Sequence, residues 1–320
     1  MAKDLFVGVD IGGTKIAAAL VSGRGKILAR GKETTPRGVG PKRILKAVEA
    51  LIKAVVAEGG YRLKDVRGVG IGAPGLVDPK GRKILASPNI KIADFPVVAW
   101  LEKRLGADVV MGNDVNVGVM GEQWLGAGKG AQNVVGLFPG TGVGGGVIAD
   151  GRLLLGAHGA ATELGHIVLD PKGPLCGCGN RGCLEALASR TAIERDIRAA
   201  IAKGERSVVS ELTGGELRVI KSKVLAKALK RKDAVVTRVM RSAAEALGAA
   251  CVDLRHVFDP ERIILGGGVI EACGDFILPI VQTCIDRDPF FKKVGACKAV
   301  PSQLGDDAVI LGGVALAKRL

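Results

Sequence analysis

A histidine and three cysteines lie close together near the middle of the chain. His166 is followed by Cys176, Cys178 and Cys183. Thiolates and imidazole nitrogens are ligands that Zn²⁺ prefers, and four of them make a closed tetrahedral site. The glycines between the cysteines allow the tight turns that one chelating loop needs. We therefore predict a structural zinc site at these four residues. The alternative is three unrelated thiols in a reduced protein, because the spacing is not the commoner Cys-x-x-Cys.

Carboxylates that could act on a hydroxyl group lie in two places. Glu163 and Glu185 flank the cysteines and histidine, and Asp114 follows Asn113 where an apolar strand gives way to a helical pattern. A carboxylate at Asp114 could take a proton from a sugar hydroxyl, with the Asn113 amide hydrogen-bonding beside it. The alternative is a helix cap, since both residue types are favoured at that position.

Two glycine-rich turns each follow an apolar strand. The first contains Gly12 and Gly13, and the second runs over residues 140–146. The second fits the dinucleotide pattern G-x-G-x-x-G, but that pattern must open a helix, and the residues after it look like another strand. Glycine turns can aim backbone N–H groups at phosphate oxygens. We predict a phosphate clamp made of both turns, although each alone could be an ordinary hairpin.

These groups must be positioned by two similar α/β halves. Apolar runs punctuated by glycine predict strands, and apolar residues at helical spacing predict helices over 44–55 and 117–125. The expected strands cover 5–9, 16–21, 27–29, 66–71 and 108–111 in the first half, and 134–138, 147–149, 152–155 and 263–265 in the second. This repeat predicts a duplicated unit, with ligands in a cleft between two domains.

Length and composition agree with a folded two-domain protein. The chain has 320 residues, 48% of them hydrophobic, which exceeds the size at which one core usually splits. The first ten residues show no apolar signal core, and the longest uncharged window, 130–149, contains seven glycines. Seven cysteines without a disulfide framework fit a reducing compartment. We expect a cytoplasmic protein that does not enter a membrane.

The charge is strongly basic, yet it does not predict nucleic-acid binding. The net charge is +14, but aromatic residues make up only 3% of the chain, so no stacking platform for single strands is present. The densest basic stretch, 203–241, is interrupted by apolar positions as an exposed helical face would be. The positive charge instead favours anionic small molecules such as nucleotides.

Six motifs in this order resemble the ROK family of sugar kinases, and most closely its bacterial glucokinases. They are Asp10-Ile-Gly-Gly-Thr-Lys15, Gly70-Ile-Gly-Ala-Pro-Gly75, Gly112-Asn-Asp-Val-Asn116, Gly140-Thr-Gly-Val-Gly-Gly-Gly146, Glu163-Leu-Gly-His166 and Cys176-Gly-Cys-Gly-Asn-Arg-Gly-Cys183. The resemblance implies two actin-like (ribonuclease H-like) α/β domains with the active site in the interdomain cleft. It implies an N-terminal domain over 1–118, to which a helix at about 305–320 returns, and a larger domain over 119–304 that carries the zinc loop.

The resemblance also implies roles for individual residues in an ATP-dependent reaction on the 6-hydroxyl of glucose. Asp114 would be the general base, and Asp10 would lie near Mg²⁺. His166 would use one ring nitrogen for zinc and the other for the sugar. The implied sugar-binding residues are Gly72, Asn89, Asn113, Asp114, Glu163, His166 and Glu185. The implied ATP-binding residues are Asp10, Gly12, Gly13, Thr14, Lys15, Gly140, Thr141, Gly142, Gly266, Gly267 and Gly268.

Several alternatives stay open. Thr162 replaces a more usual Gly or Ala, and valines at 115, 117 and 119 replace commoner alanines, so the hexose could also be N-acetylglucosamine, N-acetylmannosamine, mannose or fructose. The donor could be ATP, ADP or polyphosphate. A sugar-responsive repressor would need a DNA-binding segment ahead of Asp10, and an actin-like ATPase would not need the sugar-binding carboxylates. We expect an enzyme that forms a homodimer or homotetramer.

Overall fold

The computed structural model describes residues 4–78, 80–87 and 90–320, and its contacts divide the chain into two compact units. Unit 1 comprises Met1–Ala131, Gly151–Thr162 and Gln303–Leu320, and unit 2 comprises Gln132–Asp150 and Glu163–Ser302. The division differs from the expected boundary after residue 118, which would cut helix α3 (Asp114–Leu125). It also gives residues 151–162 to unit 1, although they were expected in the larger domain.

Unit 1 is built on a five-stranded sheet with the order β3-β2-β1-β4-β7. The strands are β1 (Leu5–Ile11), β2 (Lys15–Ser22), β3 (Ile27–Thr34), β4 (Gly68–Ala73) and β7 (Val109–Asn113). The first three form an antiparallel meander, and β4 and β7 add in parallel beside β1. A separate two-stranded ribbon joins β5 (Leu76–Val77) and β6 (Ile84–Ala86).

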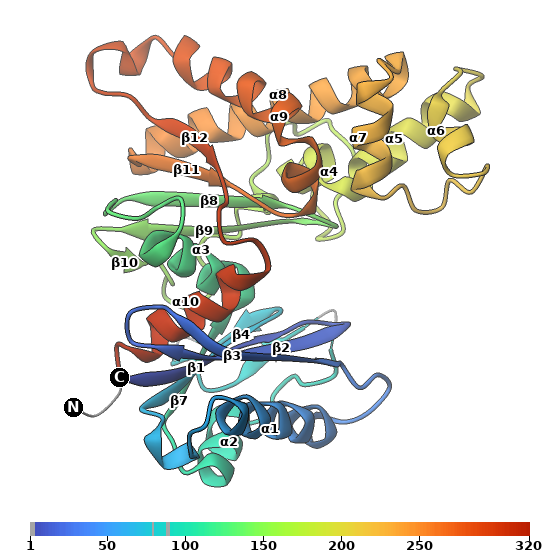
Figure 1. Cartoon of the computed structure of the whole chain (residues 1–320). Coiled ribbons are helices and arrows are strands. Elements are labelled where there is room, and N and C mark those ends of the chain that lie inside the picture. Colours follow the sequence, from blue (N-terminus) through green and yellow to red (C-terminus); the bar gives the residue numbers. More distant parts are fainter. Residues whose placement is uncertain (1–3, 79, 88–89) are drawn as a thin grey trace. The chain divides into compact units, whose positions relative to one another are not determined.

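Helices cover both faces of this sheet (Figure 1). Helices α1 (Pro41–Glu58) and α2 (Val97–Leu105) pack on one face, where Val7 and Val9 of β1 point. Helix α10 (Ala308–Ala317) packs on the other face against Phe6. The alternation of side chains along a strand explains how one apolar strand serves both cores.

Glycines let α10 approach the sheet and α3 closely. A Cβ atom at Gly70 of β4 would lie 1.7 Å from the carbonyl oxygen of Gly313, and one at Gly312 would lie 1.7 Å from that of Val117. Larger residues would push α10 away from both neighbours. This packing ties the last helix and the whole of α3 to unit 1, which explains why the boundary falls beyond residue 118.

Unit 2 repeats the same plan, with neighbouring strands in the order β9-β8-β11-β12. Strands β8 (Val134–Pro139) and β9 (Val143–Ala149) are antiparallel, whereas β11 (Arg262–Leu265) and β12 (Lys298–Pro301) add in parallel beside β8. Strand β10 (Arg152–Leu153) lies in the segment 151–162, which belongs to unit 1. The predicted duplication is therefore confirmed in the topology. The second glycine-rich segment is shorter as a turn than expected, because Val143–Gly146 already belong to β9.

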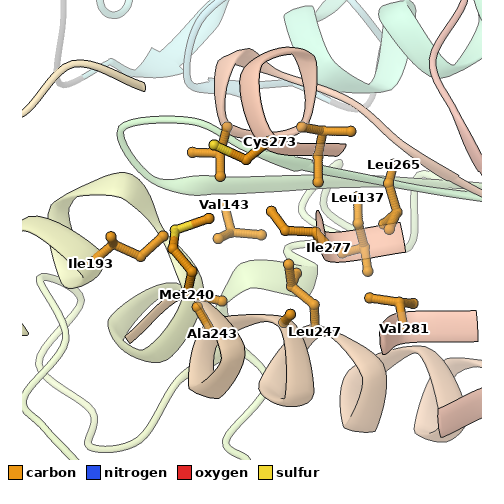
Figure 2. Close-up of a cluster of buried hydrophobic side chains, with 14 of the residues drawn as sticks. Leu137, Val143, Ile193, Met240, Ala243, Leu247, Leu265, Cys273, Ile277 and Val281 are labelled. Carbon is orange, nitrogen blue, oxygen red and sulfur yellow. The ribbon is translucent and has the colours of Figure 1, made fainter. Parts of the chain in front are cut away.

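The core of unit 2 lies between its sheet and two long helices, α8 (Ala234–Phe258) and α9 (Gly268–Arg287). Figure 2 shows Leu137 and Val143 of the sheet facing Leu247 of α8 and Ile277 of α9. Shorter helices complete the unit, namely α4 (Leu184–Ala188), α5 (Arg190–Ala202), α6 (Val208–Leu212) and α7 (Ser222–Lys230).

Among the described residues, α9 is the one helix long and apolar enough to cross a membrane by length and composition alone. It contains Pro279, and it packs against α8 and β12 within unit 2. Helices in the core of a folded domain can have the same length and apolar composition, so these two properties are only weak evidence for a membrane span.

Candidate active site

Two carboxyl groups of unit 1 lie at the ends of parallel strands. Asp10 is near the end of β1, and Asp114 begins α3 directly after β7. The pKa of Asp10 is raised from 3.8 to about 7, mainly by burial and then by the charge of Asp114, against the opposing effect of Lys15. Burial also raises the pKa of Asp114, although the hydrogen bond from the Val115 N–H opposes this. Two neighbouring acids with raised pKa values are typical of a catalytic site.

Asn113, and not Asp114, caps helix α3. The Asn113 Oδ1 accepts hydrogen bonds from the N–H groups of Val115 at 2.9 Å and Asn116 at 3.1 Å. Its Nδ2 donates to the Gly75 carbonyl oxygen at 3.1 Å. The capping alternative is therefore correct for Asn113, and most of its hydrogen-bonding capacity is used inside the protein. The Asn113 side chain also makes a hydrogen bond to Asp114 that lowers the pKa of that carboxyl.

Two hydrogen bonds to the backbone of Gly12 stabilise the first glycine turn. The Gly12 N–H donates to the Lys15 carbonyl oxygen at 2.9 Å, and Thr35 Oγ1 donates to the Gly12 carbonyl oxygen at 2.6 Å. Lys15 forms an ion pair with the exposed Asp306 at 2.8 Å. A cavity of about 640 Å³ beside the turn is lined by Gly13, Thr14 and other residues of unit 1. It offers room for a polar ligand next to the turn.

Of the expected sugar-binding residues Gly72 and Asn89, the structure describes only Gly72. Gly72 is buried in β4, where a Cβ atom would lie 2.2 Å from Val309 Cγ1 and 3.4 Å from the Asp114 Cα. Its lack of a side chain therefore makes room for α10 and for the start of α3. Asn89 lies outside the described residues.

The four predicted metal ligands of unit 2 come together. Their ligand atoms all lie within 4.8 Å of one another. Cys176 Sγ is 3.7 Å from His166 Nδ1, and Cys178 Sγ is 3.7 Å from Cys183 Sγ. A tetrahedral zinc with Zn–S bonds of about 2.3 Å has ligand edges of roughly 3.8 Å, so the donor types and their spacing fit this metal.

Short backbone pairings shape the metal-binding loop. Val168 pairs with Cys183, and Leu175 pairs with Arg181. Gly182 has a φ of +65° and passes so close to Asp170 that a Cβ atom would lie 1.5 Å from its carbonyl oxygen. Only glycine fits there. His166 ends the short 3₁₀ helix Leu164–His166, which follows the exposed Glu163.

Glu185 connects the metal-binding loop to the second glycine turn. It lies in the first turn of α4, and its Oε1 is 3.6 Å from Cys176 Sγ. Its Oε2 accepts a hydrogen bond from the Val143 N–H at 3.0 Å. The same oxygen is 2.2 Å from the place where a Cβ of Gly142 would stand. The glycine at 142 thus makes room for this carboxylate.

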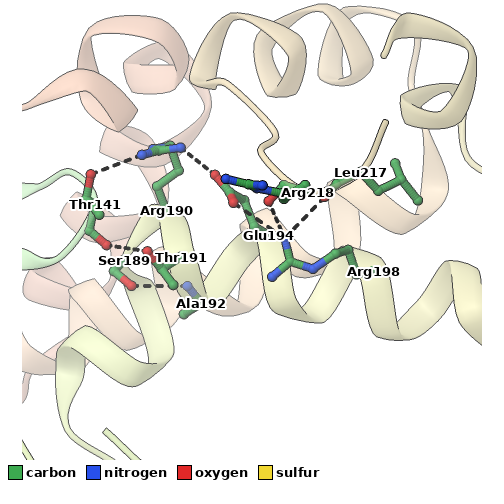
Figure 3. A network of polar contacts seen from close by, with 9 residues as sticks. All are labelled: Thr141, Ser189, Arg190, Thr191, Ala192, Glu194, Arg198, Leu217 and Arg218. Carbon is green, nitrogen blue, oxygen red and sulfur yellow. Dashed lines mark hydrogen bonds and ion pairs between the residues drawn. The ribbon is translucent and has the colours of Figure 1, made fainter. Parts of the chain in front are cut away.

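The start of α5 lies against the second glycine turn, a contact that the sequence did not predict. Figure 3 shows Arg190 and Thr191 beside Thr141, with Glu194 one helical turn further on. Thr191 Oγ1 donates to the Thr141 carbonyl oxygen at 2.7 Å, and Arg190 Nη2 donates to Thr141 Oγ1 at 3.0 Å. The glycines in the run 266–268 follow β11, where Gly267, with a φ of +79°, caps α9. A cavity of about 310 Å³ lies beside them.

The candidate site residues expected from the sequence fall into two sets, one in each unit. Unit 1 holds Asp10, Gly12, Gly13, Thr14, Lys15, Gly72, Asn113 and Asp114. Unit 2 holds Gly140, Thr141, Gly142, Glu163, His166, Cys176, Cys178, Cys183, Glu185, Gly266, Gly267 and Gly268. Two α/β units with the same strand order, each with a glycine-rich turn between its first two strands, define the two-domain actin-like class.

Within that class the chain belongs to the ROK family, whose model matches residues 6–320. It is 38% identical to a glucokinase of Thermotoga maritima over 100% of this chain and 99% of that protein. It is similar to the crystal structure of a ROK family glucokinase from Streptomyces griseus in complex with glucose and AMPPNP, with a TM-score of 0.82, 38% identity and coverage of 99% and 100%. It is also 28% identical to the xylose repressor of Caldicellulosiruptor bescii, covering 97% of this chain and 77% of that protein.

Proposed function

We propose that the chain is an ATP-dependent glucokinase that phosphorylates the 6-hydroxyl of glucose. The observation that carries the proposal is the half-buried carboxylate of Asp114, which lies at the start of α3 while its neighbour Asn113 caps the helix. The similarity to relatives named glucokinases, one of them solved with glucose and AMPPNP, supports glucose and ATP as the substrates.

In the proposed reaction Asp114 is the general base. Its carboxylate takes the proton of the sugar 6-hydroxyl as that oxygen attacks the γ-phosphorus, and the bond from phosphorus to the β,γ-bridging oxygen breaks to release ADP. A base is useful near neutral pH when its pKa is raised toward that range, and burial acts on Asp114 in that direction.

Asp10 is the residue we assign to the Mg²⁺ that accompanies ATP. This ion would neutralise charge on the phosphates during transfer. Asp10 fits the role because a nearby cation would favour the charged form of its half-buried carboxyl, whose pKa is raised to about 7. Lys15, which follows the glycine turn, is near enough for its positive charge to oppose the rise in the pKa of Asp10.

Unit 2 supplies the proposed groups that hold the other sugar hydroxyls. Glu163, His166 and Glu185 offer acceptors and one imidazole, and unit 1 adds Asn113, Gly72 and Asn89 by resemblance. The zinc that we propose at the His-Cys cluster would hold His166 and Cys176 in place. Through the Cys176–Glu185 contact of 3.6 Å, the metal-binding loop also positions a sugar-binding carboxylate. This zinc is structural, because four protein ligands leave no open position.

The phosphates of ATP would lie at the two glycine-rich turns, Gly12–Lys15 and Gly140–Gly142. The glycines at 266–268 and the cavity beside them would receive the adenosine side. These assignments are supported by the open backbone at Gly140, where no non-adjacent residue in the described ranges has an atom within 4 Å of an added Cβ, and by the position of Gly267 before α9.

A coupled assay with a panel of sugars and donors tests this function. Glucose with ATP should give the highest kcat/KM among glucose, mannose, fructose, N-acetylglucosamine and N-acetylmannosamine. Higher kcat/KM with another hexose would make the chain a different ROK kinase. Sugar binding without turnover with ATP, ADP or polyphosphate would instead favour a sugar-responsive regulator, as in the relatives named repressors.

A further inference from the structure

The N-terminus of α5 is joined to the Gly140–Gly142 turn by several hydrogen bonds. The Arg190 N–H donates to the Gly140 carbonyl oxygen at 2.8 Å, and Thr191 Oγ1 donates to the Thr141 carbonyl oxygen at 2.7 Å. Ser189 caps the helix by accepting from the Ala192 N–H at 3.1 Å. These contacts hold the helix on the turn without help from the Arg190 side chain, so that side chain is available for another purpose.

The Arg190 guanidinium lies at the turn and is held from two sides (Figure 3). Nη2 donates to Thr141 Oγ1 at 3.0 Å, and Nη1 contacts Glu194 Oε1 at 2.5 Å. The Arg190 side chain remains 22% exposed, whereas that of Glu194 is only 8% exposed. A guanidinium has five N–H donors, so these two contacts leave donors for a ligand.

The charge of Arg190 is only partly balanced. Glu194 also pairs with Arg198, whose Nη1 is 3.5 Å from Glu194 Oε2. Arg198 turns away from the glycine turn and donates to the carbonyl oxygens of Leu217 at 3.2 Å and Arg218 at 3.1 Å. One carboxylate thus faces two guanidinium groups, so Glu194 does not fully neutralise Arg190.

The backbone of the turn is suited to the same kind of ligand. In the part of the chain that the structure describes, the N–H groups of Thr141 and Gly142 contact no acceptor. Among the residues that the structure describes, none outside the turn's own neighbours has an atom within 4 Å of a Cβ built at Gly140. Free N–H groups on a glycine turn next to an arginine provide the donors and the charge that bind phosphate oxygens.

We propose that Arg190 binds the phosphate chain of the nucleotide at the Gly140–Gly142 turn, and that buried Glu194 is the residue that positions it. The proposal rests on the function proposed above, because it takes the turn as the place of the nucleotide phosphates. Arginine suits this role better than lysine, since its planar fork can contact Thr141, Glu194 and a phosphate oxygen together.

The test is direct binding of AMPPNP, ADP and AMP to Arg190→Gln, measured by calorimetry with Mg²⁺ present. Loss of a hydrogen bond between charged groups should weaken AMPPNP binding about 10- to 100-fold. The loss should shrink from AMPPNP to ADP and be smallest for AMP. Arg190→Lys, which keeps the charge but not the fork, should fall between Gln and wild type. Arg198→Gln is the matched control, because it removes another arginine from Glu194 without touching Thr141, and it should bind AMPPNP within about twofold of wild type.

Three results would overturn the proposal. The first is AMPPNP binding by a folded Arg190→Gln that equals wild type. The second is an equal loss for AMPPNP and AMP, which would mean that Arg190 only holds the helix to the turn. The third is an equal loss in Arg198→Gln. These binding results are independent of turnover, whereas failure of the proposed function would appear as wild-type protein that binds AMPPNP but phosphorylates no sugar.

Discussion

Asn113 caps helix α3 and thereby leaves the carboxylate of Asp114, the next residue, available for chemistry. Two backbone N–H groups donate to the Asn113 Oδ1, whereas the Asp114 Oδ1 accepts from the Val115 N–H at 2.9 Å, and the Asn113 side chain also hydrogen-bonds to Asp114. Asn113 therefore stabilises the helix and Asp114 provides the carboxylate for chemistry, and mutation of each residue can separate the two roles.

Asn113→Ala should destabilise the protein, whereas Asp114→Ala should not. Loss of an N-cap side chain lowers the free energy of unfolding by about 1 kcal/mol. Removing the half-buried Asp114 carboxylate takes away a group whose charged form is disfavoured by loss of water contact. Urea unfolding of the two variants beside wild type checks this. A larger loss in Asp114→Ala than in Asn113→Ala would return the capping role to Asp114.

The raised pKa of Asp10 predicts how stability depends on pH. An acid whose pKa is higher in the folded chain holds its proton more tightly there, so it favours folding at low pH. That contribution is lost as the pH rises from about 4 through about 7, because the folded pKa is about 7 against an ordinary 3.8. Three pKa units at about 1.4 kcal/mol each set an upper value of roughly 4 kcal/mol.

Asp10→Asn should therefore match wild-type stability near pH 4 and exceed it increasingly up to pH 8. Thermal unfolding without Mg²⁺ or nucleotide, at several pH values, measures the difference. Asp253→Asn, at an exposed position of α8, is the control and should show no such trend. A constant difference between wild type and Asp10→Asn at all pH values would mean that Asp10 titrates as an ordinary exposed acid.

Much of the fold could be predicted from the sequence because the glycine turns and apolar runs are local signals. The expected strands 5–9, 16–21 and 27–29 lie within β1, β2 and β3, and the expected helix 44–55 lies within α1. The repeat of the glycine turn after residue 139 predicted the second sheet. The domain boundary could not be predicted, since it depends on the tight packing of Gly312 against Val117, far apart in sequence.

The site was partly predictable for the same reason. The zinc ligands fall within eighteen residues of one another, and the structure gathers them. The contacts of Glu185 with Val143 and of Arg190 with Thr141 were not predicted, because each joins residues more than forty positions apart. The sequence also did not show whether Asn113 or Asp114 caps α3. Both residue types are favoured at that position, and the side-chain conformation decides between them.

Zinc is expected to bind at about one ion per chain. Cys178→Ser should lose most of it, whereas Cys284→Ser, which changes a thiol outside the metal-binding loop, should keep it. Loss of the ion should also raise the KM for glucose, because the loop that holds Cys176 contacts Glu185. Elemental analysis and steady-state kinetics measure both effects. Metal-free protein with full activity would contradict the zinc assignment.

The two glycines of the second turn should respond differently to alanine. A Cβ at Gly142 would occupy the place of Glu185 Oε2, at 2.2 Å, whereas none of the atoms described lies within 4 Å of a Cβ at Gly140. Gly142→Ala should displace the Glu185 carboxylate from the Val143 N–H and raise the KM for glucose several-fold, with about 1 kcal/mol or less lost in stability. Gly140→Ala should leave the KM for glucose near wild type. Equal values in both variants would argue that Glu185 does not hold the sugar.

The most direct test of the account is Asp114→Asn, because asparagine keeps the size and shape of aspartate but cannot accept the proton. Loss of a general base lowers rates by about 10²- to 10⁴-fold. We expect kcat to fall by that amount, while glucose binding measured by titration stays close to wild type, since Asn113, Glu163, His166 and Glu185 are unchanged. A folded Asp114→Asn protein that retains most of its kcat would contradict the proposed mechanism.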